Sequence, residues 1–143
     1  MRHSILALIV IGLAAIASQA QTAAPAVEMI SAEELKAKVA SNHPVTIIDV
    51  RSSEGYSAST TTVKGAIHFK LRKLKSRLFY PPLKDLPKDR EIVTYCACPK
   101  DQSSITAAQI LQAGGFKRVR VLQGGWTEWQ RVSGPVEPRT KTD

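Results

Sequence analysis

The stretch IVTYCACPKDQSSITAAQIL, residues 92–111, passes from an apolar run into a helix-like segment and contains both cysteines of the chain. The pattern predicts a buried strand that ends near Cys98, followed by a loop and a helix. A thiol on such a loop faces backbone N–H groups and the positive end of the helix dipole, and both favour the thiolate. Cys98 is therefore a candidate nucleophile, although its position alone equally allows a buried core cysteine.

The segments on either side alternate between strand and helix patterns. β-branched and apolar runs predict strands at residues 45–50, 66–69, 92–97 and 119–122. Apolar periodicity predicts helices at residues 31–40, 71–78, 104–113 and 126–132. Ser31 and Glu34 have the spacing of a capping box, and the threonine run 59–62 is predicted to be an extended loop. This order indicates an α/β domain with a mainly parallel sheet, whose ligands bind at the carboxyl ends of the strands, where Cys98 lies.

The first twenty residues have the layout of a secretory signal peptide. A positive start is followed by an uncharged apolar run of 13 residues, 5–17, and by small residues before the expected cleavage after Ala20. The run is shorter than the ~20 residues of a membrane span, but a retained anchor and a buried N-terminal helix stay as alternatives. We expect a signal peptide at 1–20, a linker at 21–30, a domain at 31–136 and a flexible tail at 137–143. Cleavage places the mature protein in a periplasm or outside the cell, with no membrane attachment.

The two cysteines, Cys96 and Cys98, are separated by one residue and cannot join distant parts of a fold. Side chains at this spacing on a strand point to the same face, so the two thiols should lie together. In an oxidising compartment they could form a disulfide, or one could act as a nucleophile beside the other. A further interpretation is a Cys-x-Cys metal or redox site, since two soft thiolates suit Cu(I), with Met29 as the one methionine of the mature chain.

The chain carries a formal charge of +8, part of it in residues 70–77, where five positive charges stand in eight residues. Such a cluster attracts small oxyanions, phosphate head groups or an acidic protein partner. The simpler interpretation is the solvated face of a helix, with Leu71, Leu74 and Leu78 turned toward the core. We do not expect binding to nucleic acid, because no aromatic residues interleave with the basic run.

Four segments together resemble the signatures of the single-domain rhodanese-like family, the sulfurtransferases, in an exported form. They are Asp49-Val50-Arg51, Val63 to Phe69, Cys98 to Ser104 with Ala107-Ala108, and Leu122 to Trp126 with Trp129 and Gly134-Pro135. The resemblance spans about residues 31–136. It implies an α/β fold with a central, mainly parallel sheet of about five strands and helices on both faces. Asp49 and Arg51 are expected to form a buried hydrogen-bonded pair, and Trp126 and Trp129 to lie in the core.

The resemblance also implies a reaction and its residues. In rhodaneses a cysteine thiolate takes a sulfane sulfur from an anionic donor such as thiosulfate, and the resulting persulfide passes it to a thiol or cyanide, without a cofactor or metal. Cys98 is the implied nucleophile because it gives a loop of six residues, the length found in sulfurtransferases. Cys96 would give a loop of eight and is the second choice. The implied anion-binding residues of the loop are Pro99, Lys100, Asp101, Gln102, Ser103 and Ser104.

The loop departs from the family pattern at two places. Asp101 stands where many rhodaneses have a glycine, and Ser103 stands where they have an arginine. The aspartate adds negative charge where an anion should bind, which Lys100 can offset. Without the arginine we expect weaker binding of thiosulfate, and another physiological donor stays open. Ser103 or Ser104 is predicted to cap the following helix. Two alternatives to the enzyme stay open: a catalytically weak rhodanese-like binding or regulatory module, and the Cys-x-Cys metal or redox protein.

Overall fold

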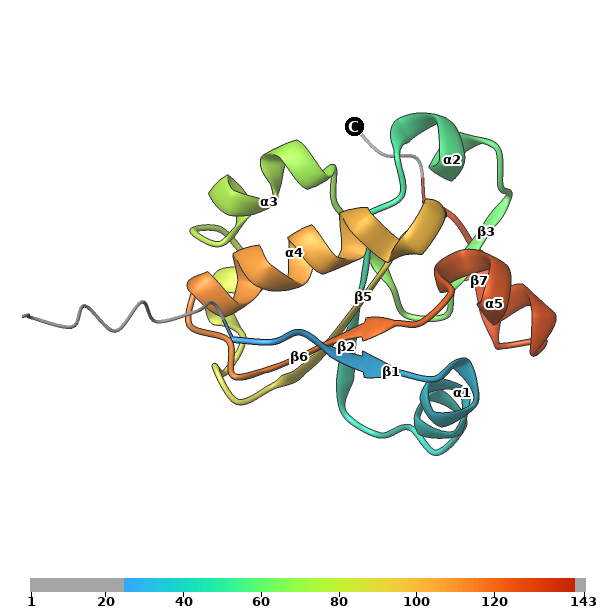
Figure 1. Ribbon diagram of the computed structural model, residues 1–143, viewed down its shortest axis with the longest axis horizontal. Coiled ribbons are helices and arrows are strands. Elements are labelled where there is room, and N and C mark those ends of the chain that lie inside the picture. The colour runs from blue at the N-terminus through green and yellow to red at the C-terminus, as the bar shows by residue number, and fades with distance from the viewer. Residues whose placement is uncertain (1–24, 141–143) are drawn as a thin grey trace, which may run out of the picture.

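The computed structural model describes residues 25–140 and shows an α/β domain built on a five-stranded parallel sheet (Figure 1). The sheet has the order β1-β6-β5-β2-β4, and every neighbouring pair in it is parallel. Its strands are β1 (Glu28–Ile30), β2 (Val45–Asp49), β4 (Ile67–His68), β5 (Glu91–Tyr95) and β6 (Arg118–Leu122). A second sheet pairs β3 (Thr61–Val63) with β7 (Val136–Pro138) in antiparallel fashion. The predicted signal peptide, residues 1–20, lies outside the described residues.

Helices cover both faces of the large sheet, as predicted. They are α1 (Ala32–Ala40), α2 (Ser53–Ser57), α3 (Leu71–Arg77), α4 (Gln102–Ala113) and α5 (Gly125–Arg131), with 3-10 turns η1 (Leu83–Asp85) and η2 (Pro99–Asp101). Buried residues of α3 and α4 share one apolar cluster, and those of α1 and α5 share another on the opposite face. The predicted fold class is thereby confirmed. No helix within residues 25–140 is long and apolar enough to cross a membrane.

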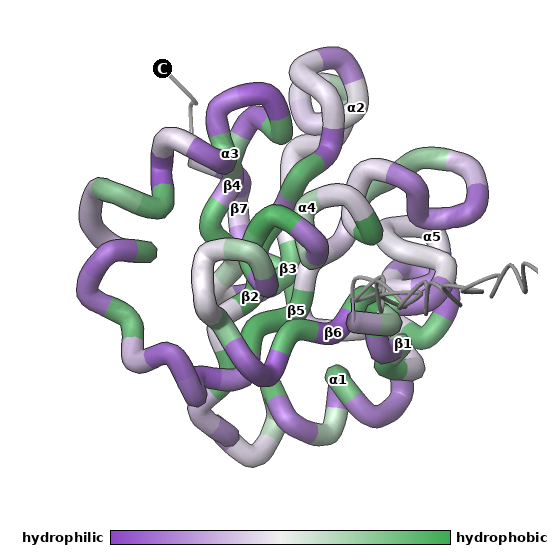
Figure 2. Tube along the Cα trace, turned by 60° about the vertical axis from the view of Figure 1, so that its left-hand side comes forward, coloured by the Kyte–Doolittle hydropathy of each residue, from purple (hydrophilic) through white to green (hydrophobic). Residues whose placement is uncertain are grey.

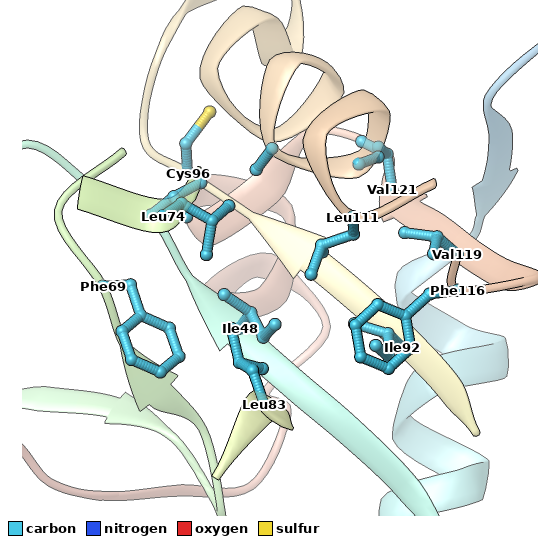
Figure 3. Close-up of a cluster of buried hydrophobic side chains, with 13 residues drawn as sticks. Ile48, Phe69, Leu74, Leu83, Ile92, Cys96, Leu111, Phe116, Val119 and Val121 are labelled. Carbon is cyan, nitrogen blue, oxygen red and sulfur yellow. The ribbon is translucent and has the colours of Figure 1, made fainter. Parts of the chain in front are cut away.

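Consecutive residues of the central strands enter opposite clusters. In β2, Ile47 packs on the side of α1 and α5, and Ile48 on the side of α3 and α4. In β5, Val93 packs on the side of α1 and α5, and Ile92 on the side of α3 and α4. Figure 3 shows Ile48 and Ile92 among the side chains of the cluster under α3 and α4. A strand that is buried on both faces needs an unbroken apolar run. For this reason the sequence predicted β2 and β5 to within two residues at each end.

The basic run forms α3, and its leucines face the core as predicted. Leu74 is fully buried, while Leu71 and Leu78 pack against the same cluster. The basic side chains of Arg72, Lys73, Lys75 and Arg77 are exposed. Figure 2 shows the hydrophilic colour recurring along this helix. The helix is therefore amphipathic, and it presents a positively charged outer face next to α4, with which it is in contact.

Three short strands lie where the sequence predicted irregular segments. Residues 28–30 form β1 and pair with β6, so the predicted linker 21–30 is wrong at its end. Residues 61–63 form β3 rather than an extended loop, and β7 includes residues 137 and 138 of the predicted flexible tail 137–143. Each of these strands has only three residues, too few to show an alternating pattern in the sequence. Their partner strands, rather than their own composition, hold them in place.

Glu91 begins β5 as a buried carboxylate among basic side chains. It is only 3% exposed, with Lys38 Nζ at 3.1 Å and Arg118 Nη2 and Arg120 Nη1 at 3.4 Å from its carboxylate oxygens. Burial works to raise the pKa of the Glu91 carboxyl, but the hydrogen bond from Lys38 and the neighbouring positive charges outweigh it. The pKa of this carboxyl is therefore lower in the folded protein than its ordinary value.

The substitution Glu91→Gln is expected to destabilise the fold at neutral pH and to matter less in acid. Because the folded pKa is the lower one, the stabilisation is present above the ordinary glutamate pKa of about 4.3 and is lost as pH falls through the folded value. We expect the unfolding free energy to fall by roughly 1–3 kcal/mol at about pH 7, and by much less at about pH 3. Urea unfolding of both proteins at both pH values measures the difference. An equal loss at both would contradict a stabilising ionised Glu91.

Candidate active site

Cys98 lies on the loop that connects β5 to α4, at the carboxyl end of the middle strand of the large sheet. β5 ends at Tyr95, and the next residues alternate between buried Cys96, exposed Ala97 and half-buried Cys98. Parallel α/β sheets bind their ligands at this end of the strands. The structure therefore places Cys98 at the position that the sequence predicted, within reach of solvent.

The backbone of the loop turns back over the sulfur of Cys98. Lys100 and Asp101 adopt left-handed backbone conformations, with φ of 54° and 55°. This turn brings the start of α4 to the thiol group, and the backbone N–H of Ser103 lies 3.4 Å from Cys98 Sγ, to which it donates. An N–H group directed at a sulfur atom favours negative charge on it. The loop is therefore suited to hold an anionic sulfur.

Cys96 and Cys98 are joined by a disulfide in the structure, and their Cα atoms are 5.6 Å apart. The sequence had left a disulfide, a nucleophile with a neighbouring thiol, and a metal or redox site as alternatives for this pair. Cys96 is 1% exposed and belongs to the apolar cluster under α3 and α4, where Figure 3 shows its sulfur pointing away from Leu74, on the side of α4. Reduction of the disulfide is therefore required before Cys98 can act as a thiolate.

Ser104 lies beneath the loop rather than on it. Its side chain is fully buried, its hydroxyl donates to the carbonyl of Asp101 at 2.9 Å, and it lies 3.4 Å from Cys96 Sγ. The prediction that Ser103 or Ser104 caps the helix with its side chain is wrong, because α4 begins at Gln102 without a side-chain cap. The register was misplaced because the loop enters the helix two residues earlier than the apolar pattern indicated.

Asp101 holds the loop to the start of α5. Its carboxylate is largely buried and accepts a hydrogen bond from the backbone N–H of Gly124 at 2.9 Å. The side chain thus points away from the centre of the loop, where the sequence had led us to expect its charge. The side chains of Pro99, Lys100 and Gln102 are exposed, and Ser103 is half-buried. These four residues form the solvent-facing part of the loop.

Gly125 and Trp126 hold the backbone of Cys96 from the other side. The N–H of Trp126 donates to the carbonyl of Cys96 at 2.8 Å. A side chain at Gly125 would overlap this same carbonyl oxygen, and the residue has a φ of 50°. Glycine is needed here because both the close approach of two backbones and the left-handed conformation disfavour a Cβ atom. The last of the four signature segments therefore contacts the backbone two residues before Cys98.

The substitution Gly125→Ala is expected to lower the unfolding free energy by about 2–4 kcal/mol, because the new Cβ pushes the carbonyl of Cys96 away. Gly65→Ala is the matched control, since Gly65 also has a positive φ, of 78°, but no atom within 4 Å of the added Cβ. We expect the control to cost only about 1 kcal/mol. Urea unfolding of the two variants separates the steric effect from the backbone effect. Equal losses would argue against the close contact.

A buried ion pair supports the end of β5 below the loop. Arg51 Nη2 donates to Asp49 Oδ2 at 2.7 Å, and both side chains are fully buried, as predicted. The hydroxyls of Tyr95 and Thr62 lie 2.7 and 3.1 Å from the same carboxylate oxygen. Burial and the charge of Asp49 raise the pKa of the Tyr95 hydroxyl, which keeps it a donor. The guanidinium of Arg51 lies over the ring of Trp126, 4.3 Å from its centroid.

Sequence reasoning missed Tyr95 and Thr62 as members of this network. The signal that was available is a polar group in each of two otherwise buried strands, since a buried hydroxyl needs a hydrogen-bond partner. Trp126 and Trp129 are buried, which confirms their predicted place in the core. Among residues 25–140, no three His, Cys, Asp or Glu side chains lie close enough together to hold a metal ion.

A protein-family model covers most of the described domain. The sequence profile of the family described as "Rhodanese-like domain" matches residues 31–132. "Arsenate reductase 2.1" of Oryza sativa subsp. japonica is 31% identical over an alignment of 128 residues, which covers 83% of this chain and 77% of that protein. "Sulfurtransferase" of Allochromatium vinosum is 29% identical over 110 residues, 77% of this chain and 94% of that one. The solved rhodanese-like domain of the Alr3790 protein from Anabaena sp. has a TM-score of 0.64 at 28% identity, covering 78% of this chain and 79% of its own.

Proposed function

Because the chain belongs to the rhodanese-like domain family, we propose that it moves a sulfane sulfur from an anionic donor such as thiosulfate to a thiol or cyanide through a persulfide on Cys98. A relative named as a sulfurtransferase supports sulfur transfer in general. The observation that carries the specific proposal is the half-exposed Cys98 at the carboxyl end of β5, with the N–H of Ser103 directed at its sulfur.

In thiosulfate an outer sulfur atom is bonded to the sulfur of a sulfite group, and the proposed reaction takes place at this S–S bond. After reduction of the disulfide, the Cys98 thiolate attacks the outer sulfur of thiosulfate, the S–S bond of the donor breaks, and sulfite leaves with the electron pair. The persulfide left on Cys98 is anionic, and the N–H of Ser103 at the turn into α4 favours this negative charge as it would that of an oxyanion. A thiolate or cyanide then attacks the outer sulfur and releases the Cys98 thiolate.

The charge of the domain supports an anionic donor. The exposed face of α3 carries four basic side chains beside α4, the helix that follows the loop. A positive surface raises the local concentration of small anions and speeds their encounter with the site. Lys100 on the exposed part of the loop adds one more positive charge. These charges compensate for the arginine that the loop lacks at Ser103, and the same face suits an acidic protein partner.

We also propose that the protein acts outside the cytoplasm, in a periplasm or as a secreted protein. The support is the charge and apolar pattern of residues 1–20. The Cys96–Cys98 disulfide is compatible with an oxidising compartment, where a partner thiol system has to supply the reduced form. Location of the protein by fractionation of the cells that make it tests this part separately.

The test of the function is release of sulfite from thiosulfate by the reduced protein, with cyanide and a dithiol both present as acceptors. Several turnovers per protein molecule above the protein-free background are expected. Sulfite reports the first chemical step whichever acceptor takes the sulfur, so the readout does not depend on the acceptor. Absence of sulfite, from a protein whose two thiols are shown to be reduced, would contradict the proposal and favour the binding or regulatory module.

A further inference from the structure

We propose that Cys96 is the resolving thiol of this site: it attacks the sulfur of Cys98 in the persulfide and expels the outer sulfur as sulfide. This inference rests on the proposed function, because it begins from the Cys98 persulfide. It adds a second outcome to the reaction, in which the chain reduces the sulfane sulfur instead of handing it to an acceptor. The observation behind it is the bond that the structure contains between the two sulfur atoms.

The position of Cys96 in the structure leaves Cys98 as the group with which its thiol can react. Its side chain is 1% exposed, enclosed by the apolar cluster below the loop, so neither a donor anion nor an external thiol can reach it. Cys98 is half-buried, and its sulfur can be bonded either to an added sulfur or to Cys96. A persulfide on Cys98 therefore brings an electrophilic sulfur to a buried thiol that has no other substrate.

The groups around Cys96 and Cys98 hold the two sulfur atoms close to each other. The carbonyl of Cys96 is held by the N–H of Trp126 at 2.8 Å, and the Ser104 hydroxyl lies 3.4 Å from Cys96 Sγ. Because the O–H of Ser104 donates to the carbonyl of Asp101, its oxygen can accept a hydrogen bond from the Cys96 thiol. The N–H of Ser103 contacts the sulfur of Cys98 itself. Backbone and side-chain contacts thus hold both sulfur atoms in the arrangement that the disulfide requires.

A structural role for the disulfide explains the pair less well. The bond closes a ring with a sequence separation of only two residues. The stabilisation of a fold by a disulfide comes largely from closing long loops in the unfolded chain, and it is small for so short a loop. The loop here is in any case held by the bond from the Gly124 N–H to the Asp101 carboxylate and by the bond from the Trp126 N–H to the Cys96 carbonyl. The bond therefore has its main consequence in the chemistry of Cys98.

The proposed step balances in atoms and electrons. Cys98–S–SH and Cys96–SH give the Cys96–Cys98 disulfide and H₂S: the S–S bond of the persulfide breaks, the new S–S bond forms, and the proton of Cys96 leaves with the sulfide. The sulfur of Cys96 is oxidised and the outer sulfur is reduced. An external dithiol, protein or small molecule, then reduces the disulfide by exchange. The cycle converts thiosulfate and a dithiol to sulfite, H₂S and the oxidised dithiol.

A single turnover without any other thiol tests this step. The protein is reduced, freed of reductant under anaerobic conditions, and mixed with thiosulfate. We expect about one sulfite and about one sulfide per protein, and a final mass about 2 Da below the reduced form. The variant Cys96→Ser is expected to release sulfite, to release no sulfide, and to keep a mass gain of about 32 Da, one sulfur atom. Reduced protein without thiosulfate controls for oxidation by air.

The outcomes separate the two proposals. If the natural protein releases sulfite, keeps the gain of about 32 Da and gives no sulfide, then sulfur transfer stands and the role of Cys96 is overturned. If neither protein releases sulfite, the proposed function fails, and the resolving step fails with it. The products of the natural protein decide the question even if Cys96→Ser does not fold. Cys96→Ala, which removes the hydroxyl as well, is expected to behave as Cys96→Ser does.

Discussion

Replacement of Cys98 by serine is expected to lower the rate of sulfite release from thiosulfate by at least about a thousandfold. The serine hydroxyl has nearly the shape of the thiol, but it stays un-ionised at neutral pH, and the single N–H of Ser103 is far too little to change that. The loss should appear in the first chemical step, since no persulfide forms. Sulfite release by the reduced variant, with cyanide and a dithiol present, measures it.

Two further variants make this experiment specific. Ala97→Ser adds a hydroxyl at the exposed residue between the two cysteines and is expected to leave sulfite release unchanged. Cys96→Ser tests the other cysteine, and sulfite release should persist in it because Cys98 is intact. A loss confined to Cys96→Ser would show that the nucleophile had been assigned to the wrong cysteine. Urea unfolding of the three variants excludes a loss of folded protein as the cause.

The sequence predicted several segments of this site because the features that identify them lie within short stretches of the chain. The unbroken apolar runs predicted β2 and β5, and the thiol followed β5 by a short loop, so Cys98 had to lie at the carboxyl edge of the sheet. The buried pair of Asp49 and Arg51 was also predicted, because Asp49-Val50-Arg51 resembles the first signature of the family. These features follow from residues that are near one another in the chain.

Contacts between distant segments were not predictable in the same way. Asp101 bonds to Gly124, 23 residues away, and nothing local shows that its carboxylate turns from the loop toward that N–H. Ser104 lies under the loop because Lys100 and Asp101 take left-handed conformations that their residue types do not require. β1 and β7 depend on β6 and β3, which lie far along the chain. In each of these cases the local sequence did not show which distant residue or strand the segment would contact.

The sequence also did not show whether the two cysteines form a disulfide or stay as free thiols. Spacing showed only that Cys96 and Cys98 could be close, and it gave the same expectation for a metal site, a redox pair and a nucleophile with its neighbour. The two cysteines differ in their exposure to solvent: Cys96 is buried, whereas Cys98 is half-buried and reaches solvent. That difference, set by the end of β5 and the packing of α4, is what gives the two cysteines separate roles in the proposed reaction.

The substitution Asp49→Asn is expected to have the largest effect on stability, a loss of about 3–5 kcal/mol in the unfolding free energy. Asparagine keeps the shape of aspartate, but it leaves the guanidinium of Arg51, which is 1% exposed, without a compensating charge. It also turns one of the two carboxylate oxygens into an NH2 group, which cannot accept the bonds that Arg51 and Tyr95 donate to this carboxylate. A buried charge that loses its partner is strongly unfavourable, whereas an exposed one is solvated by water.

Asp89→Asn is the matched control for this prediction, because it makes the same chemical change at an exposed residue and should shift stability by no more than about 0.5 kcal/mol. Urea unfolding at neutral pH measures both variants. Since Tyr95 is the last residue of β5 and Cys96 follows it, loosening of Asp49 should also reduce the fraction of protein that forms the persulfide. A cost for Asp49→Asn equal to that of Asp89→Asn would mean that solvent or another group takes over the charge of Arg51, and that the pair does not support the loop.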